Sequence, residues 1–338
     1  MKTRPARQPH SASRRNFLRA STAAVAAAGC LPRVISAAPL AESTPESLTK
    51  VLFDTLTEKQ RAAMCFDWNY MDPKRGLLRT RVANNWMITE EEIRGEFYTD
   101  EQRDLVRKIF EGIVSPEWLV NFDQQLEDDC GGFGHEQSIA IFGKPGDGNF
   151  EFVLTGRHMT LRCDGNSAEH VAFGGPIFYG HAPNDTEQPD HRGNVFWYQA
   201  KEANKVYAML DGKQRSAAEV AKTPREQSVA FQGRGGEFSG IPVTDLSGDQ
   251  KSQLQKTLMT LVEPFRKSDR EEALKCLDSQ GGLDACHLSF FTDNDLGKDK
   301  VWDNWRIEGP SFVWHYRGAP HVHVWVNLAD SSEVKLNA

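Results

Sequence analysis

Patterns typical of helices and patterns typical of strands occupy separate blocks of this chain, and this separation limits the folds open to it. Apolar residues recur at helical spacing through residues 48–56, 99–110 and 115–122, whereas short alternating runs broken by glycine begin at residue 135. A second helical block follows, and the chain ends in further alternating runs. A doubly wound parallel sheet would require strict alternation of strands and helices. The blocks therefore predict an α+β fold, with helices packed against a mostly antiparallel sheet in a single large domain.

Capping boxes mark several expected helix starts, because a Ser or Thr followed three residues later by Glu or Gln satisfies the first backbone N–H groups of a helix. Such pairs begin at Thr57, Thr99, Ser247 and Ser268. Pro116, which suits the first turn of a helix, follows Ser115 at another start. We also expect residues 195–210 to be helical.

Strand-like runs fall into two groups. The first contains residues 138–142, 151–154, 158–163 and 170–178, and the second contains residues 288–291, 302–307, 312–316 and 321–326. Between the groups, residues 184–193 read as an exposed loop. The amino-acid sequence shows no internal repeat.

The N-terminus has the features of a twin-arginine export signal. Arg14 and Arg15 precede an apolar, alanine-rich run at residues 20–28, and small residues follow at 36–38. We therefore expect residues 1–38 to be a signal peptide that directs the folded protein to the twin-arginine export machinery. The mature protein is then periplasmic or secreted.

Two positions in the N-terminal segment could become the start of the mature protein. We expect cleavage near Ala37, because Pro39 would hinder a peptidase that cuts after Ala38. Cys30 offers an alternative, since Ala27-Ala28-Gly29-Cys30 weakly resembles a lipoprotein cleavage site, and lipid attachment there would tether the protein.

The mature part, residues 39–338, is acidic. The whole chain has a net charge of −7, but residues 1–38 hold seven basic residues and no acid, so the remainder has 33 basic against 47 acidic residues and a charge of −14. Such a chain repels polyanions, which argues against nucleic-acid binding. No stretch of the mature part approaches the roughly 18 apolar residues of a spanning helix, so we expect no transmembrane segment there.

Five cysteines remain in the mature part, and none has the CxxC spacing of a redox or zinc site. Cys276 and Cys286 flank a glycine-containing segment. They are expected either to form a disulfide in an oxidising compartment or to remain two buried thiols.

A histidine pair near the C-terminus is the first candidate for chemistry. Side chains alternate along a strand, so His321 and His323 share one face while the intervening Val322 points to the other. Two imidazoles on one face can reach a common ion, and zinc, copper and iron all accept imidazole nitrogen. An HxH pair alone is weak evidence, because exposed strands also alternate His with Val.

Further histidines strengthen this hypothesis. A short connection separates the strand holding His315 from the strand holding His321, so a hairpin would pair the two strands. His158 and His181 lie on or at the end of earlier strands. The candidate metal ligands are therefore His158, His181, His315, His321 and His323.

Four segments carry a resemblance to a known family. They are Gly156-Arg157-His158-Met159-Thr160-Leu161-Arg162, then residues 175–180, then Gly309-Pro310-Ser311-Phe312, and then Pro320-His321-Val322-His323-Val324-Trp325. In order, they resemble the landmarks of the family known as domain of unknown function 3500, whose members are mostly secreted. The resemblance spans about residues 45–330 and implies one family domain.

The resemblance implies no reaction, because the activity of the family is not established. Its histidine-bearing segments match His158, His321 and His323 here. Many members carry a carboxylate where this chain has His315, and a residue other than histidine where it has His181. The first difference is compatible with a metal site, because both side chains are metal ligands.

Arg157, Arg162 and Arg317 lie beside these histidines and are the candidate catalytic residues, since they can bind an anionic substrate. Alternatively, the three arginines form salt bridges in an acidic protein. The histidines and arginines would then form a hydrogen-bonded cluster without a metal ion.

The leading hypothesis is an exported, metal-dependent enzyme that uses zinc, copper or iron for hydrolytic or oxidative chemistry on a small-molecule or peptide substrate. The chain contains no GxSxG and no HExxH motif, so serine hydrolase and zincin mechanisms have no support. The alternatives are a non-catalytic ligand-binding protein of the cell envelope and a structural protein tethered through Cys30.

Overall fold

The computed structural model describes residues 44–182, 195–295 and 301–337. The residues from Glu42 to Ala338 form one compact unit. The expected signal peptide at 1–38, with Cys30, and the expected loop at 184–193 lie outside the described residues. Among the helices that are described, none has the length and apolar character needed to cross a membrane.

Among the described residues, four helices precede the four longer strands in each half of the chain. The helices are α1 (Pro45–Thr55), α2 (Glu58–Met64), α3 (Asp100–Ile113), α4 (Leu119–Cys130), α5 (Tyr198–Met209), α6 (Gly212–Ala218), α7 (Gly248–Val262) and α8 (Lys267–Gln280). Capping boxes begin α2, α3 and α7 at Thr57, Thr99 and Ser247, as the sequence predicts.

Most of the described strands join one large sheet. In chain order they are β1 (Cys65–Phe66), β4 (Gln137–Gly143), β5 (Phe150–Gly156), β6 (Met159–Cys163), β7 (Ile177–His181), β8 (Glu219–Val220), β9 (Ile241–Pro242), β10 (His287–Phe291), β11 (Asn304–Gly309), β12 (Phe312–Arg317) and β13 (Val322–Leu328). The short strands β2 (Met71–Asp72) and β3 (Gly76–Leu77) pair separately.

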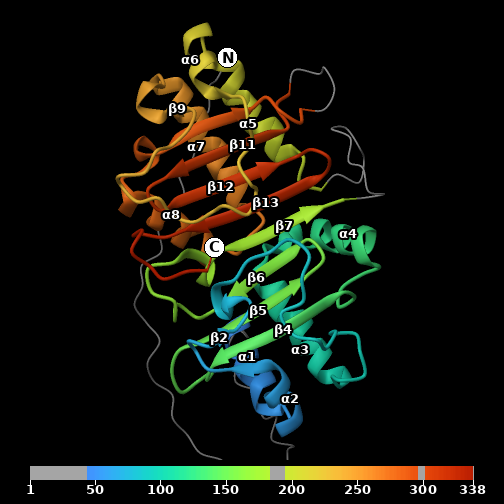
Figure 1. The fold of residues 1–338 in the computed structure, drawn as a ribbon. Coiled ribbons are helices and arrows are strands. Elements are labelled where there is room, and N and C mark those ends of the chain that lie inside the picture. The colour runs from blue at the N-terminus through green and yellow to red at the C-terminus, as the bar shows by residue number, and fades with distance from the viewer. Residues whose placement is uncertain (1–43, 183–194, 296–300, 338) are drawn as a thin grey trace, which may run out of the picture. The chain divides into compact units, whose positions relative to one another are not determined.

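The sheet order is β1-β4-β5-β6-β7-β13-β12-β11-β10-β8, with β9 paired to β10 (Figure 1). The pairs β1–β4 and β8–β10 are parallel, and the other neighbours are antiparallel. The predicted α+β fold, with a mostly antiparallel sheet in a single domain, is confirmed.

The same succession of elements occurs twice, although the sequence shows no repeat. The order α1, α2, β1, α3, α4, β4 to β7 is matched by α5, α6, β8, α7, α8, β10 to β13. The two halves meet where β7 and β13 pair antiparallel. The turns of β5–β6 and β11–β12 correspond, because Gly156 pairs with Met159 and Gly309 with Phe312. The molecule is thus built from two similar halves joined at the centre of one sheet.

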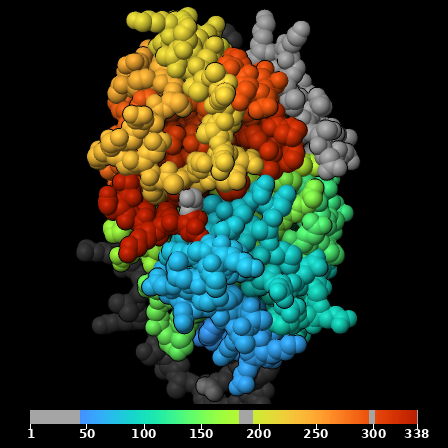
Figure 2. Space-filling model, viewed as in Figure 1, coloured from blue at the N-terminus to red at the C-terminus, as the bar shows by residue number. Residues whose placement is uncertain are grey.

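The two faces of the sheet are covered differently. Helices pack on one face around the main apolar core, where Val322, Val324 and Val326 of β13 are buried. Figure 1 shows α7 and α8 behind β12 and β13. Irregular segments cross the other face: Trp86 donates to Thr160, and Arg306 donates to the carbonyl of Ser228. Figure 2 shows these segments, cyan and golden yellow, on the viewer's side.

Two expectations about the fold are corrected, and one open alternative is decided. Residues 170–178 do not form one strand, because Gly174 and Gly175 have φ of 75° and 152° and β7 begins only at Ile177. The capping box at Ser268 is wrong, since α8 begins at Lys267 and the Ser268 hydroxyl donates to Asp269. Cys276 and Cys286 form no disulfide and are buried thiols, which was the other alternative.

Candidate metal site

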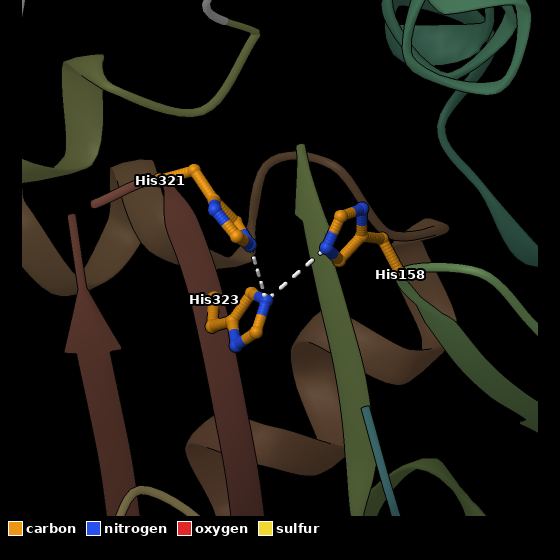
Figure 3. Close-up of side chains that lie close together, drawn as sticks. All are labelled: His158, His321 and His323. Atoms are coloured by element: carbon orange, nitrogen blue, oxygen red, sulfur yellow. Dashed lines mark hydrogen bonds between the residues drawn. The ribbon is translucent and has the colours of Figure 1, made fainter. Parts of the chain in front are cut away.

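Three histidines from two distant parts of the chain meet on the face of the sheet that the irregular segments cover (Figure 3). The Nε2 atom of His323 lies 3.1 Å from Nε2 of His158 and 2.9 Å from Nε2 of His321. One ligand atom from each of the three lies within 4.8 Å of the others. We call His158, His321 and His323 the histidine group, and its geometry can hold a metal ion.

The strand pairing places two members of the group. His321 directly precedes β13 and His323 lies within it, on the face opposite the core valines. β13 pairs with β7 so that His323 lies across from Gly180. The alternation expected from the sequence therefore brings both imidazoles to one side, at the seam between the two halves.

Gly180 makes room for the imidazole rings. A Cβ atom at this position would lie 3.3 Å from Cδ2 of His323, 3.4 Å from Cδ2 of His158 and 2.3 Å from the carbonyl oxygen of Val322. Atoms do not approach a Cβ as closely as this carbonyl would, so any side chain here would force the strands or the rings apart.

His158 reaches the group from the tight turn between β5 and β6. Its φ is 52°, a conformation that few residues other than glycine adopt. Its backbone N–H donates to Oδ1 of Asn85 at 2.9 Å, and its carbonyl accepts from the N–H of Gly180 at 3.1 Å. The turn keeps a histidine where glycine would fit more easily, which is typical of functional positions.

Two carboxylates orient the imidazoles from behind. Nδ1 of His158 lies 2.7 Å from Oδ2 of Asp129, at the end of α4, and Nδ1 of His323 lies 2.9 Å from Oε2 of Glu226. A carboxylate on the second ring nitrogen is the usual outer partner of a metal-binding histidine. Nδ1 of His321 is buried and has no hydrogen-bond partner among the described residues.

The carboxylates are ionised and act as acceptors. Burial alone would raise the pKa of Asp129, but its hydrogen bond and ion pair with His158 hold that pKa below its usual value. Burial acts on Glu226 in the same way, and His323 lowers the pKa of this carboxyl too. Nδ1 of each imidazole can donate to its carboxylate, and the Nε2 atoms of His158 and His323 then face each other, 3.1 Å apart.

The Nε2 atoms of His321 and His323, 2.9 Å apart, are not readily protonated. Burial, followed by the neighbouring His323 and Arg317, lowers the pKa of His321 to about 3. Burial also lowers the pKa of His323 to about 4, against the opposing effect of Glu226. Converging neutral imidazole nitrogens at this distance fit a shared cation, because imidazole is a ligand for zinc, copper and iron.

The structure does not bring His315 into the histidine group. The predicted hairpin of β12 and β13 forms, but Arg317 pairs with His323 and His315 pairs with Trp325. His315 thus lies further along β12, where Nε of Arg306 donates to its Nδ1 at 3.2 Å. Burial, then Arg306, lowers its pKa well below the usual value.

His181 is also outside the group. It lies at the end of β7 across from Val322, whose side chain is in the main core. Its Nε2 lies 3.2 Å from Oδ2 of Asp128, and the N–H of Val195 donates to its Nδ1 at 3.2 Å.

The three predicted arginines have different surroundings. Arg162 is buried, donates to Glu151 at 3.1 Å and to the carbonyl of Pro176 at 2.8 Å, and so has the structural role given by the salt-bridge interpretation. Arg157 adjoins His158 in the β5–β6 turn. Arg317 lies 3.3 Å from Glu226 and is the arginine that contacts partners of the histidine group.

Asp129 and Glu226 are the residues that the sequence analysis missed. Asp129 follows another acid at the end of a helix, and Glu226 lies in an irregular segment, so neither has a motif that marks it. The relevant signal for Asp129 is that α4, which ends at Cys130, precedes the run of strands β4 to β7 whose β5–β6 turn carries His158.

The fold and the histidine group together define a class of protein: a two-half α+β sheet protein with a candidate metal centre at the seam. The chain belongs to the family described as "Protein of unknown function (DUF3500)", whose family model matches residues 42–327. No curated protein and no solved structure matches the chain.

Proposed function

We propose that this protein is a metal-dependent enzyme whose ion is bound by Nε2 of His158, His321 and His323. The observation that carries the proposal is the convergence of these nitrogens while the opposite nitrogens of His158 and His323 bond carboxylates. This arrangement fixes both the tautomer and the orientation that metal binding requires.

Three histidine ligands leave a coordination position for water or substrate, which is typical of catalytic and not of structural ions. The ion would supply Lewis acidity if it is zinc, and electron transfer or oxygen activation if it is copper or iron. The chain's own contribution is to orient the rings through Asp129 and Glu226 and to exclude water around His158 and His323, which are 1% and 3% exposed. His321 is half-buried, so a substrate would approach from its side.

The proposal includes export by the twin-arginine machinery to the periplasm or the exterior. The supporting observation is the paired arginines followed by an apolar run in residues 1–38. Export of a folded chain allows the ion to be bound before transport.

Elemental analysis of the purified full-length protein tests the metal proposal and identifies the ion. We expect one zinc, copper or iron per chain in the wild type and its loss in His323→Ala. His170→Ala is the matched control, because His170 is an exposed histidine that bonds Asp330 and lies outside the histidine group. This variant should retain the ion.

The same measurement separates the alternatives. A wild-type protein that neither contains an ion nor binds added zinc, copper or iron would contradict the proposal and favour a non-catalytic ligand-binding protein of the envelope. An ion that His323→Ala retains would place the metal elsewhere in the chain.

A further inference from the structure

We propose that Arg317 is a positioning residue of the histidine group, which it organises through Glu226 and His321 without binding the ion or the substrate. The inference deepens the proposed function and rests on it. It assigns to Arg317 a role other than recognition of an anionic substrate.

The register of the sheet places Arg317 beside the group. Arg317 is the last residue of β12 and pairs directly with His323 of β13. Side chains of paired residues lie on the same face, so the guanidinium and the imidazole are neighbours. The side chain of Arg317 is only 19% exposed.

The guanidinium contacts two different partners of the group. Its Nε forms an ion pair, without a hydrogen bond, at 3.3 Å from Oε2 of Glu226, the same oxygen that Nδ1 of His323 bonds at 2.9 Å. Its terminal nitrogen donates to the backbone carbonyl of His321 at 3.2 Å. The side chain of Arg317 thus connects Glu226, the carboxylate partner of His323, with the backbone of His321.

Glu226 depends on such a connection because of where it lies. It belongs to an irregular segment whose neighbouring residues Arg225 and Gln227 are exposed. The segment is attached to the sheet beyond Glu226, where Arg306 and Asn327 donate to the carbonyls of Ser228 and Val229. Arg317 provides a contact to the carboxylate itself from a strand, which is the more rigid element.

Charge and positioning predict opposite effects when Arg317 is replaced. A guanidinium repels a nearby dication, so its charge alone weakens binding of the ion, and its removal would strengthen binding. If Arg317 instead holds Glu226 and His321 in place, its removal weakens binding. Loss of an outer partner of a metal ligand reduces affinity by about 10–100-fold. The sign of the change therefore distinguishes the two roles.

The test is a titration of the metal-free full-length protein with Co²⁺, followed by the visible absorption of the bound ion. We expect Arg317→Gln to bind Co²⁺ about 10–100-fold more weakly than the wild type. Arg317→Lys should also bind more weakly although it keeps the charge, because a single ammonium replaces the two guanidinium nitrogens that separately contact Glu226 and the carbonyl of His321. Arg107→Gln is the matched control, since Arg107 is 26% exposed and ion-pairs with Asp123 in another part of the molecule.

A coupling measurement separates positioning from general destabilisation. In a Glu226→Gln background, the further loss caused by Arg317→Gln should be smaller than in the wild type, because the ion pair with Glu226 is already lost and only the hydrogen bond to the carbonyl of His321 remains to be removed. If Arg317→Gln does not fold, Arg317→Lys decides.

Equal or tighter Co²⁺ binding by the Arg317 variants overturns this inference alone, and so do fully additive effects of the Glu226 and Arg317 changes. Absence of Co²⁺ binding by the wild type overturns the proposed function together with this inference.

Discussion

Gly180 and His158 determine at the residue scale whether the three rings can meet. Gly180 supplies empty space between two of the rings, and His158 holds a backbone conformation that few side chains tolerate. Gly180 has no reactive side chain that would draw attention to it. The sequence also does not reveal the unusual backbone conformation of His158. Both gain importance only through their position in the turn and the strand.

Replacement of Gly180 by alanine is expected to destabilise the protein by about 1–3 kcal/mol, the usual range for overpacking. The new Cβ would lie 2.3 Å from the carbonyl oxygen of Val322, so β7 and β13 must separate. Chemical denaturation measures the change. Gly248→Ala is the control, because a Cβ there has no neighbour within 4 Å and the substitution should leave the free energy of unfolding equal or higher.

Two substitutions of His158 should differ in stability although both remove a ligand. Asparagine tolerates positive φ, whereas a β-branched residue does not. With φ at 52°, His158→Val is expected to be less stable than His158→Asn by about 1–2 kcal/mol. Thermal or chemical unfolding of the metal-free variants checks this, and equal stabilities would contradict the backbone argument.

The sequence predicts the three histidines of the group, but it does not predict how their surroundings are arranged. Alternation in a strand is a local rule, so His321 and His323 could be placed on one face in advance. The pairing of β12 with β13 was also predictable, but the register was not, and it brings Arg317 instead of His315 across from His323. Asp129 and Glu226 approach through tertiary packing, for which no local pattern exists.

Paired glutamines join helices in both halves at the scale of elements. Gln60 and Gln102 exchange amide hydrogen bonds of 2.8 and 3.1 Å between α2 and α3. Gln214 and Gln250 do the same between α6 and α7, at 3.0 and 2.8 Å. Each glutamine is also the third helical residue of a capping box. A residue expected only to begin a helix therefore also fixes the packing of two helices.

Gln102→Ala and Gln250→Ala should each destabilise the protein by about 1–3 kcal/mol, because each leaves a partner amide without its hydrogen bonds. Gln250 also donates to the carbonyl of Met209 at 2.8 Å, and Gln102 to that of Thr55 at 3.2 Å. Denaturation midpoints measure both effects. An exposed glutamine, Gln227, is the control and should tolerate alanine with little change.

The sequence correctly predicted the helix starts at Thr57, Thr99 and Ser247, where the serine or threonine directly precedes the first helical residue. The prediction fails at Ser268, because Arg266 and the hydroxyl of Ser268 both donate to Asp269, the third residue of α8. An ion pair thus replaces the capping box, and a sequence pattern alone does not distinguish the two.

Stability of the whole molecule should depend on pH through Glu272 of α8. Burial, then the neighbouring Asp164, raises the pKa of Glu272 from 4.5 to about 7. The folded state therefore holds this proton more tightly than the unfolded chain does. The resulting stabilisation is present below pH 4.5 and is lost as pH rises to about 7.

The difference in unfolding free energy between the wild type and Glu272→Gln isolates this contribution. We expect the wild type to lose stability relative to the variant as pH rises from 4.5 to about 7. Denaturation at several pH values measures it. Glu271→Gln, on the neighbouring exposed residue, should show no such trend.

The similarity of the two halves implies two corresponding places at the central seam, and one of them carries the histidine group. The hydrogen bond from Gly180 to the carbonyl of His158 has its counterpart in the bond from Ala329 to the carbonyl of Ser311, at 2.9 Å. Ala329 pairs with Val171 as Gly180 pairs with His323, so Val171 stands where the other side has His323. Neither Ser311 nor Val171 has a ring nitrogen, so the near-twofold plan of the described backbone provides the histidine group once, and the proposed ion would bind once per chain.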